Sequence, residues 1–159
     1  MSEKLSPSAQ SVQDSLRKSG LTLNVVELPA STRTASDAAE AIGCEVQHIA
    51  KSLVFRGKTT DAPVLVIASG TNRVNEKRMS KLARESLVKA DADFVRDRTG
   101  FAIGGIPPVG HFEPLKTYID EDLFKYEVIW AAAGTPHAVF KLKPDDLLKM
   151  TGGKVVAIK

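Results

Sequence analysis

The glycine-rich stretch at residues 99–110 is the first part of the sequence whose residue types could do chemistry. It reads TGFAIGGIPPVG and holds four of the eleven glycines and two of the eight prolines. Paired glycines let a backbone approach a ligand closely, and prolines hold that backbone rigid. The amides of Gly104, Gly105 and Ile106 could therefore act as fixed hydrogen-bond donors. A tight loop whose glycines only satisfy unusual backbone angles is the alternative interpretation.

Lys51 is the second candidate, because it interrupts the apolar stretch IAKSLVF at residues 49–55. A lysine in such a strand must point to solvent or serve a partly enclosed site. Strand alternation gives Lys51 the face of Leu53 and Phe55 and not that of Ser52, which argues against a purely solvent-facing side chain. An edge-strand lysine that discourages aggregation is the alternative interpretation.

A basic segment at residues 73–89 is the third candidate. Its six cations and two anions give a local charge of +4, whereas the whole chain carries +3. The small excess of positive charge in the chain is therefore confined to this segment. Such a segment suits a phosphate backbone, although a solvated helix face is the simpler interpretation. No aromatic residue interleaves the cations, so base stacking is not expected there.

The remaining reactive residues predict no metal or nucleophilic centre. The single cysteine, Cys44, cannot form an intramolecular disulfide, and with three scattered histidines it gives no zinc-ligand spacing. His137 follows Gly-Thr-Pro at a predicted turn, and no Ser/Asp arrangement around it suggests a triad. We therefore interpret it as structural from its position, and we expect neither a metal nor a cofactor.

Helices and short strands alternate along the chain and must position these candidates. Ser6, Thr34 and Asn75 are predicted N-caps, Asp120 is predicted to cap a further short helix, and the helix after Asn75 is expected to bury Leu82. The pattern predicts a mixed α/β fold, one domain over residues 1–159. The predicted strands are residues 21–28, 50–55, 63–69, 116–119, 127–132, 138–142 and 155–158, with the second and third forming a hairpin.

Composition excludes several classes of protein. With 159 residues, 43% of them hydrophobic, the chain can build one core but not several. No apolar run approaches the ~20 residues that span a bilayer, and residues 1–4 lack the apolar core of a signal peptide. We expect a cytoplasmic protein that does not associate with membranes.

Taken together, the motifs resemble the YbaK/prolyl-tRNA-synthetase-associated domain family, which is related to the editing domain inserted in bacterial prolyl-tRNA synthetases. The resemblance implies a strongly curved mixed β-sheet flanked by helices. It also implies a free-standing deacylase that hydrolyses the ester between a wrongly attached amino acid and the terminal adenosine of a tRNA. The matching motifs are AKSLV at 50–54, VIASG at 66–70, VNEK at 74–77, TGF at 99–101, GGIPPVG at 104–110, ID at 119–120 and AAG at 132–134.

The same resemblance assigns roles to individual residues. Lys51 looks like the family's pocket lysine, and residues 104–108 look like its G-x-x-x-P loop beside the aminoacyl group. The residues expected to be catalytic are Lys51, Gly104, Gly105 and Ile106. Those expected to bind substrate are Ser52, Ser69, Gly70, Thr99, Pro107, Pro108, Gly134 and His137, although a pocket histidine occurs in only some subgroups. Those expected to contact tRNA phosphates are Arg73, Lys77, Arg78 and Lys81.

The chemistry of these residues is compatible with that role. An aminoacyl ester is already activated, so its hydrolysis needs a positioned water and oxyanion donors more than a protein nucleophile. Lys51 would hold the terminal phosphate or the adenosine, and the substrate's own ribose hydroxyl would help to activate water. The expected partner is mischarged tRNA, with prolyl-tRNA synthetase as a second candidate. A noncatalytic tRNA-binding or synthetase-associating module and a hydrolase of an unrelated small ester are the alternatives.

Overall fold

The hairpin predicted from the sequence forms the centre of the fold. The computed structural model describes residues 5–159, and in it β2 (Ile49–Gly57) pairs antiparallel with β3 (Pro63–Ser69). Every residue of β3 is buried, as expected for a strand covered on both faces. The two predicted strands and their hairpin pairing are confirmed.

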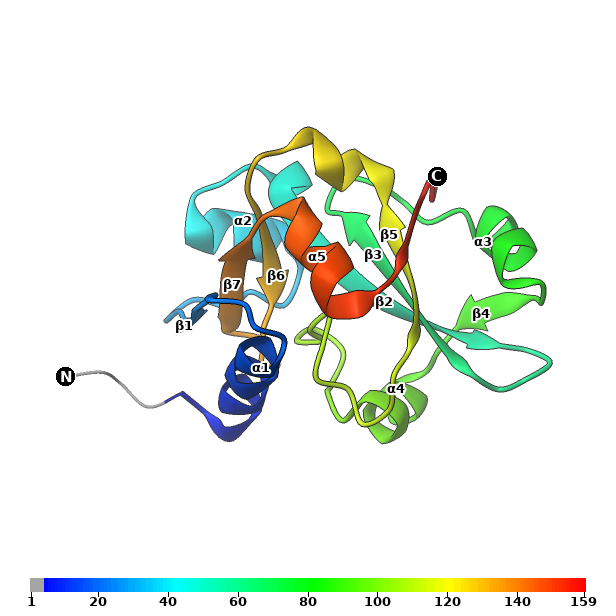
Figure 1. Ribbon diagram of the computed structural model, residues 1–159, viewed down its shortest axis with the longest axis horizontal. Helices are drawn as coiled ribbons and strands as arrows, with labels where there is room; N and C mark the ends of the chain where they lie inside the picture. The colour runs from blue at the N-terminus through cyan, green and yellow to red at the C-terminus, as the bar shows by residue number, and fades with distance from the viewer. Residues whose placement is uncertain (1–4) are drawn as a thin grey trace.

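Within the described residues, eight strands form one mixed, twisted sheet around this hairpin (Figure 1). The pairs β2–β6, β3–β5 and β5–β8 are parallel, and the other pairs are antiparallel. The predicted fold class, a mixed sheet flanked by helices, is confirmed. In space the strands follow the order β1 (Val25–Glu27), β7 (Ala138–Leu142), β6 (Ile129–Ala132), β2, β3, β5 (Lys116–Asp120) and β8 (Lys154–Val156), with β4 (Leu87–Lys89) also beside β2.

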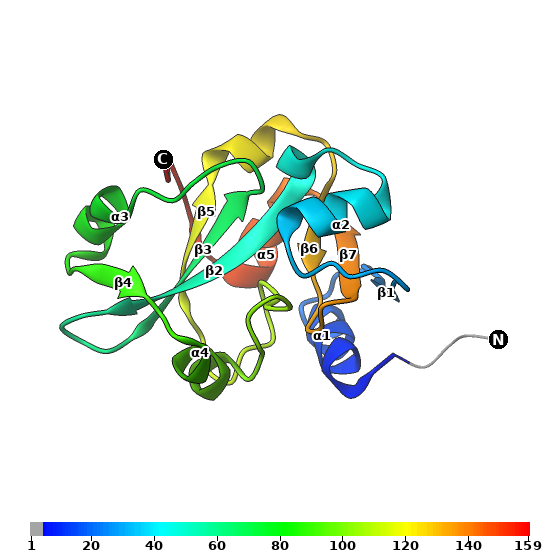
Figure 2. The same ribbon diagram turned by 180° about the vertical axis from the view of Figure 1, so that it is seen from behind.

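The helices cover both faces of this sheet. In Figure 1 α5 lies in front of the sheet, and in Figure 2, seen from behind, α2 lies in front. The helices are α1 (Pro7–Lys18), α2 (Ala35–Ile42), α3 (Glu76–Ala83), α4 (Ala92–Thr99) and α5 (Pro144–Thr151), with the 3-10 helices η1 (Val46–His48) and η2 (Glu121–Lys125).

Local capping explains where several helices begin. The side chains of Thr34, Asn75 and Asp120 each accept a hydrogen bond from a backbone N–H two or three residues further on, at 2.9 to 3.1 Å. These bonds satisfy N–H groups that the first helical turn leaves free. The three predicted caps are confirmed. Ser6 occupies the predicted N-cap position before Pro7, but without a side-chain cap bond.

Strand alternation divides β2 between two cores. Ala50 and Val54 belong to a core that also contains residues of α1, α4 and α5. Phe55 belongs to a second core, together with Met79 of α3. Because Lys51 shares its face with Phe55, its side chain emerges on the α3 side of the sheet, as the sequence alternation predicts.

The structure corrects one predicted buried residue, two predicted strand boundaries and one missed strand. Leu82 is 41% exposed, because α3 buries only Met79 and presents its remaining faces to solvent. The first strand is confined to Val25–Glu27 instead of residues 21–28, and β8 spans Lys154–Val156 instead of residues 155–158. Strand β4 was not predicted, because three residues are too few to show alternation.

Within residues 5–159 no helix is long and apolar enough to cross a membrane. Residues 1–4, for which the sequence predicts no signal segment, lie outside the described part of the chain.

Candidate active site

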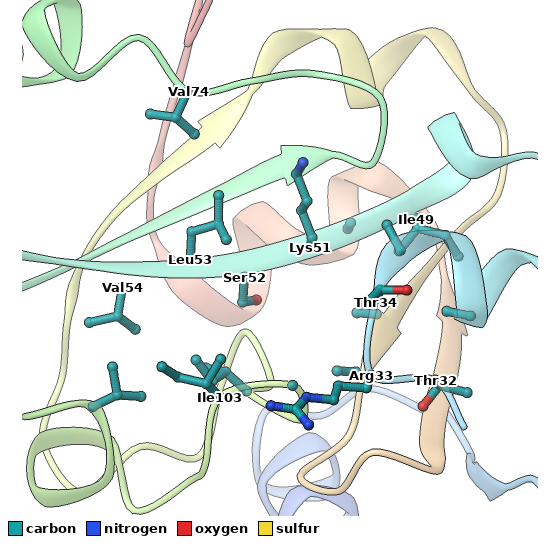
Figure 3. Close-up of a pocket in the computed structure, with 18 of the residues that line it drawn as sticks. Thr32, Arg33, Thr34, Ile49, Lys51, Ser52, Leu53, Val54, Val74 and Ile103 are labelled. Carbon is teal, nitrogen blue, oxygen red and sulfur yellow. The ribbon is translucent and has the colours of Figure 1, made fainter. Parts of the chain in front are cut away.

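A pocket opens where the central strand β2 lacks a neighbour. β3 pairs along nearly all of β2, but the other edge of β2 is paired only at its ends, by β6 at Ile49 and Ala50 and by β4 from Phe55 to Gly57. A pocket of about 910 Å³ occupies the gap (Figure 3). Its walls come from β2, β6, the glycine-rich loop and the segments before α2 and α3. This volume is typical of small-molecule and cofactor sites.

Lys51 lies on the α3 side of the gap, in the middle of the unpaired stretch of β2. Its half-buried side chain donates from Nζ to the carbonyl of Gly70 at 3.4 Å. Burial, and then the nearby Arg73 guanidinium, lower the pKa of Lys51, while the Asp120 carboxylate opposes this change. Among the described residues no carboxylate forms a salt bridge with Lys51. Its charge is therefore available to an anionic group of a ligand.

A buried carboxylate fixes the turn that receives Lys51. Asp120 is 1% exposed and accepts hydrogen bonds from the Ser69 N–H at 2.9 Å and from the Asn72 side-chain amide at 2.8 Å. These bonds tie the end of β3 to the end of β5, next to the Gly70 carbonyl. Asp120 therefore acts on Lys51 through this turn and through its charge, as a positioning residue.

The glycine-rich loop forms the opposite wall of the pocket. Gly104, with φ of 99°, and Ile106 both line it, and within residues 5–159 neither N–H donates a hydrogen bond to the protein. Gly105 is different, because its N–H donates to the Ala102 carbonyl at 3.2 Å and its own carbonyl accepts the Gly134 N–H at 2.8 Å. Two of the three predicted donors thus have no partner within residues 5–159, and the third builds the loop.

A histidine holds the proline end of this loop. The ring of His111 donates from Nε2 to the Pro107 carbonyl at 2.7 Å and packs edge-on against Phe101. The carbonyl can only accept, so the proton must lie on Nε2. Burial lowers the pKa of His111, which favours the neutral ring at physiological pH. The neutral His111 ring therefore stabilises the loop through this hydrogen bond.

Two hydroxyl groups beside the pocket have no partner. Thr32 Oγ1 and Ser52 Oγ are buried, and neither makes a hydrogen bond within the described residues. Both residues line the pocket, and Ser52 points away from Lys51, toward Ile103 and Arg33 (Figure 3). A buried polar group without a partner costs roughly 1–3 kcal/mol.

Comparison with known proteins identifies a family whose domain includes this pocket. The family model of the aminoacyl-tRNA editing domain matches residues 29–150, a range that contains every residue lining the pocket. The chain belongs to the aminoacyl-tRNA editing domain family.

Solved and curated relatives agree with this assignment of the editing domain. A crystal structure described provisionally as a trans-editing enzyme for prolyl tRNA synthetase matches with a TM-score of 0.92 and 50% identity, over 98% of this chain and 99% of that one. The uncharacterized protein YwhH of Bacillus subtilis is 30% identical over 132 residues, 83% of each chain. Enterococcus faecalis EbsC, provisionally named a Cys-tRNA(Pro)/Cys-tRNA(Cys) deacylase, is 29% identical over 128 residues, 79% of this chain and 76% of that protein. The family predicted from the sequence motifs is confirmed.

The editing domain brings five of the predicted site residues together at one pocket. Lys51 and Ser52 come from β2, Gly104 and Ile106 from the glycine-rich loop, and Arg73 from the segment before α3. They are widely separated along the chain, so only the fold can assemble them.

Other residues predicted to act in the site do not line the pocket. Ser69 Oγ donates to the Gln47 carbonyl at 2.7 Å, and Thr99 Oγ1 donates to the Val95 carbonyl at 2.6 Å. Both hydroxyls are therefore occupied within the protein. The predicted residues that do not line the pocket are Ser69, Gly70, Thr99, Gly105, Pro107, Pro108, Gly134 and His137.

His137 supports the wall that carries the free Thr32 hydroxyl. It is exposed, and its Nδ1 makes a hydrogen bond with the Ala30 carbonyl at 3.0 Å. The adjacent Pro136 carbonyl accepts the Thr32 N–H at 2.6 Å. The structure thus places His137 where it can hold the segment before α2, and His137 does not line the pocket.

The basic residues divide into two groups. Arg73 and Lys89 line the pocket, whereas Lys77, Arg78 and Lys81 are exposed on α3, outside it. Most residues of the pocket wall were not predicted as site residues from the sequence, and five of them matter for the argument below. These are Thr32, Arg33, Leu53, Val74 and Ile103.

Proposed function

We propose that this editing domain is a trans-editing deacylase that hydrolyses the ester of mischarged tRNA, with tRNA-Pro carrying alanine or cysteine as the first substrates to test. The observation that carries the proposal is the gap beside β2. It joins the Lys51 cation, two unpartnered hydroxyls and the free amides of Gly104 and Ile106 around one pocket. The names of the relatives support the same activity.

The pocket contains the groups that ester hydrolysis needs. The free N–H groups of Gly104 and Ile106 can donate to the oxyanion that forms when water attacks the ester carbonyl. Lys51 can hold the terminal phosphate of the tRNA. Among the described residues, Glu76 is the one carboxylate in the wall, and it lies at the start of α3, outside this loop. Activation of the attacking water therefore falls to a ribose hydroxyl of the substrate.

The apolar part of the wall suits selection of the amino acid by size. Ala38, Ala50 and Ala131 line the pocket together with Ile49 and Val139. Such walls discriminate one methylene by only about 10- to 200-fold, which is why a synthetase needs a second site for small competitors. A small aliphatic or thiol side chain fits these walls better than a charged one.

A deacylation assay tests the proposed function. Alanyl- and cysteinyl-tRNA-Pro are incubated with the protein, and prolyl-tRNA-Pro serves as the correctly charged control. We expect at least one mischarged tRNA to be hydrolysed well above its spontaneous rate, and the correct tRNA to be spared. Tight binding of tRNA without turnover would instead establish the noncatalytic module. Equal cleavage of free aminoacyl esters would indicate a general esterase.

The α3 cations are expected to contact tRNA outside the pocket. Replacing Lys77, Arg78 and Lys81 with glutamine should weaken tRNA binding about tenfold and reduce the slope of log K against log salt by about 2, because each phosphate contact releases counterions. Binding is measured by filter retention at low and at physiological salt. Glutamine at Lys18, Lys141 and Lys149, which lie on α1, β7 and α5, is the control with the same change of charge. An equal loss in both triple variants would contradict a tRNA contact at α3.

A further inference from the structure

The open edge of β2 presents backbone groups to the pocket. In an antiparallel ladder, the N–H and C=O of alternate residues point to the same side of a strand. Gly57 donates to the Ala62 carbonyl on the β3 side, whereas Lys58 donates to the Ser86 carbonyl on the β4 side. Odd-numbered residues of β2 therefore face β3, and even-numbered residues face the gap. Ser52 and Val54 are the even-numbered residues within it.

Two of these backbone groups lie free and adjacent. The Val54 carbonyl accepts the Ala90 N–H at 3.4 Å, and β6 pairs no further along β2 than Ala50. This leaves the N–H and carbonyl of Ser52 and the N–H of Val54 without a partner strand in the described part of the chain. The Ser52 carbonyl and the Val54 N–H are neighbours along this edge. A buried backbone polar group normally has a partner, so this acceptor and donor await a ligand.

The shape of the gap limits what that ligand can be. β6 closes one end of the open edge and β4 closes the other, so an extended peptide could not continue past them. A short planar group that places a donor beside an acceptor would fit. Adenine has such an edge, because its exocyclic N6–H donates next to the N1 acceptor, whereas guanine reverses the order.

Aliphatic side chains lie on both sides of this edge. Leu53 and Val74 stand on the Lys51 side of β2, and Val54 and Ile103 stand on the opposite side (Figure 3). A base bonded to the strand edge would extend the plane of the sheet and lie between the two pairs. Ile103 is 49% exposed without a ligand, so such a base would cover apolar surface that is otherwise open to water.

We propose that the open edge of β2 reads the terminal adenine of the tRNA, with the Ser52 carbonyl accepting from N6 and the Val54 N–H donating to N1. This inference rests on the proposed function, because the deacylase acts at the terminal adenosine. It adds the base to the parts of the substrate that the pocket recognises. Leu53, Val74 and Ile103 would cover the faces of the base, and the aminoacyl group would extend toward Gly104.

Substrates altered in the base test this proposal without altering the protein. Minihelices are acylated chemically and end in adenosine, purine riboside, 1-deazaadenosine or 7-deazaadenosine. Purine riboside lacks the N6 donor and 1-deazaadenosine lacks the N1 acceptor, so each should lower kcat/KM about 10- to 100-fold. The 7-deazaadenosine control keeps this edge intact and should stay within about twofold of adenosine. Spontaneous hydrolysis of each ester is subtracted.

The outcomes separate this proposal from the proposed function. Cleavage of purine riboside and 1-deazaadenosine substrates at the adenosine rate would overturn the adenine contact and leave the deacylase intact. Failure to cleave even the adenosine substrate would overturn the deacylase, and the adenine contact with it. An equal loss with all three analogues would also overturn the adenine contact. The 7-deazaadenosine substrate keeps the N6–N1 edge, so the loss could not come from that edge.

A pair of protein variants gives a second measurement. Ile103→Ala removes the exposed aliphatic cover and should raise KM for the adenosine substrate about three- to tenfold, with kcat unchanged. Phe112→Ala is the matched control, since Phe112 is 77% exposed nearby but does not line the pocket. An equal KM for Ile103→Ala and the parent protein would contradict the placement of the base over this residue.

Discussion

Alanine at Lys51 is expected to lower kcat/KM for mischarged tRNA by about 100-fold, because a half-buried cation that binds an anionic group contributes on the order of 3 kcal/mol. Lys51 is the one lysine at the centre of the open edge, and the only hydrogen bond of its side chain within residues 5–159 is the long contact to the Gly70 carbonyl. Single-turnover kinetics with the parent protein and the variant measure the loss. Lys141→Ala, an exposed lysine on β7, is the control and should leave the rate unchanged.

The same residue predicts a dependence on pH. Burial and Arg73 lower the pKa of Lys51 below that of an exposed lysine, so its positive charge is lost earlier as the pH rises. The enzymatic rate above spontaneous hydrolysis should therefore fall at a pH below the ordinary lysine pKa of about 10.4. Lys51→Arg keeps its charge throughout this range and should remove the alkaline decline, even where its rate is lower. Parallel profiles for the two proteins would remove Lys51 from the pH dependence.

Features set by neighbouring residues could be predicted from the sequence. The Thr34, Asn75 and Asp120 caps depend on a side chain and an N–H two or three residues apart, so a local pattern identifies them. The alternation of side chains along β2 likewise predicted the face of the sheet on which Lys51 lies. The gap beside β2 could not be predicted in this way, because it depends on where β4 and β6, from distant parts of the chain, stop pairing.

Most residues of the pocket walls could not be predicted from the sequence either. Thr32 and Arg33 directly precede a predicted helix cap, and this position beside a helix N-terminus was the only signal that could have indicated them. Ile103 lay within the glycine-rich loop but looked like an ordinary apolar residue. Gly105 was predicted as a donor, yet its amide bonds within the loop, because a glycine pair does not show which amide faces outward.

Alanine at Gly105 is expected to lower kcat/KM about 100-fold although it removes no functional group. A Cβ at this position would lie 2.8 to 2.9 Å from three backbone atoms of Thr135, so the loop must move away from the turn between β6 and β7. This movement would break the Gly134 N–H bond to the Gly105 carbonyl and shift the free amides of Gly104 and Ile106. Misplacement of catalytic groups by about 1 Å costs about 100-fold in rate.

The loss should appear in kcat more than in tRNA affinity, because the α3 cations and Lys51 stay in place. Gly152→Ala is the matched control. Gly152 ends α5 with φ of 63°, and a methyl group added there would have no other atom within 4 Å, so alanine should cost about 1 kcal/mol of stability without loss of activity. Unfolding midpoints and single-turnover rates are measured for both variants. A Gly105→Ala protein that keeps the parent rate would show that the position of this loop does not control the chemistry, and it would remove the Gly104 and Ile106 amides from the oxyanion site.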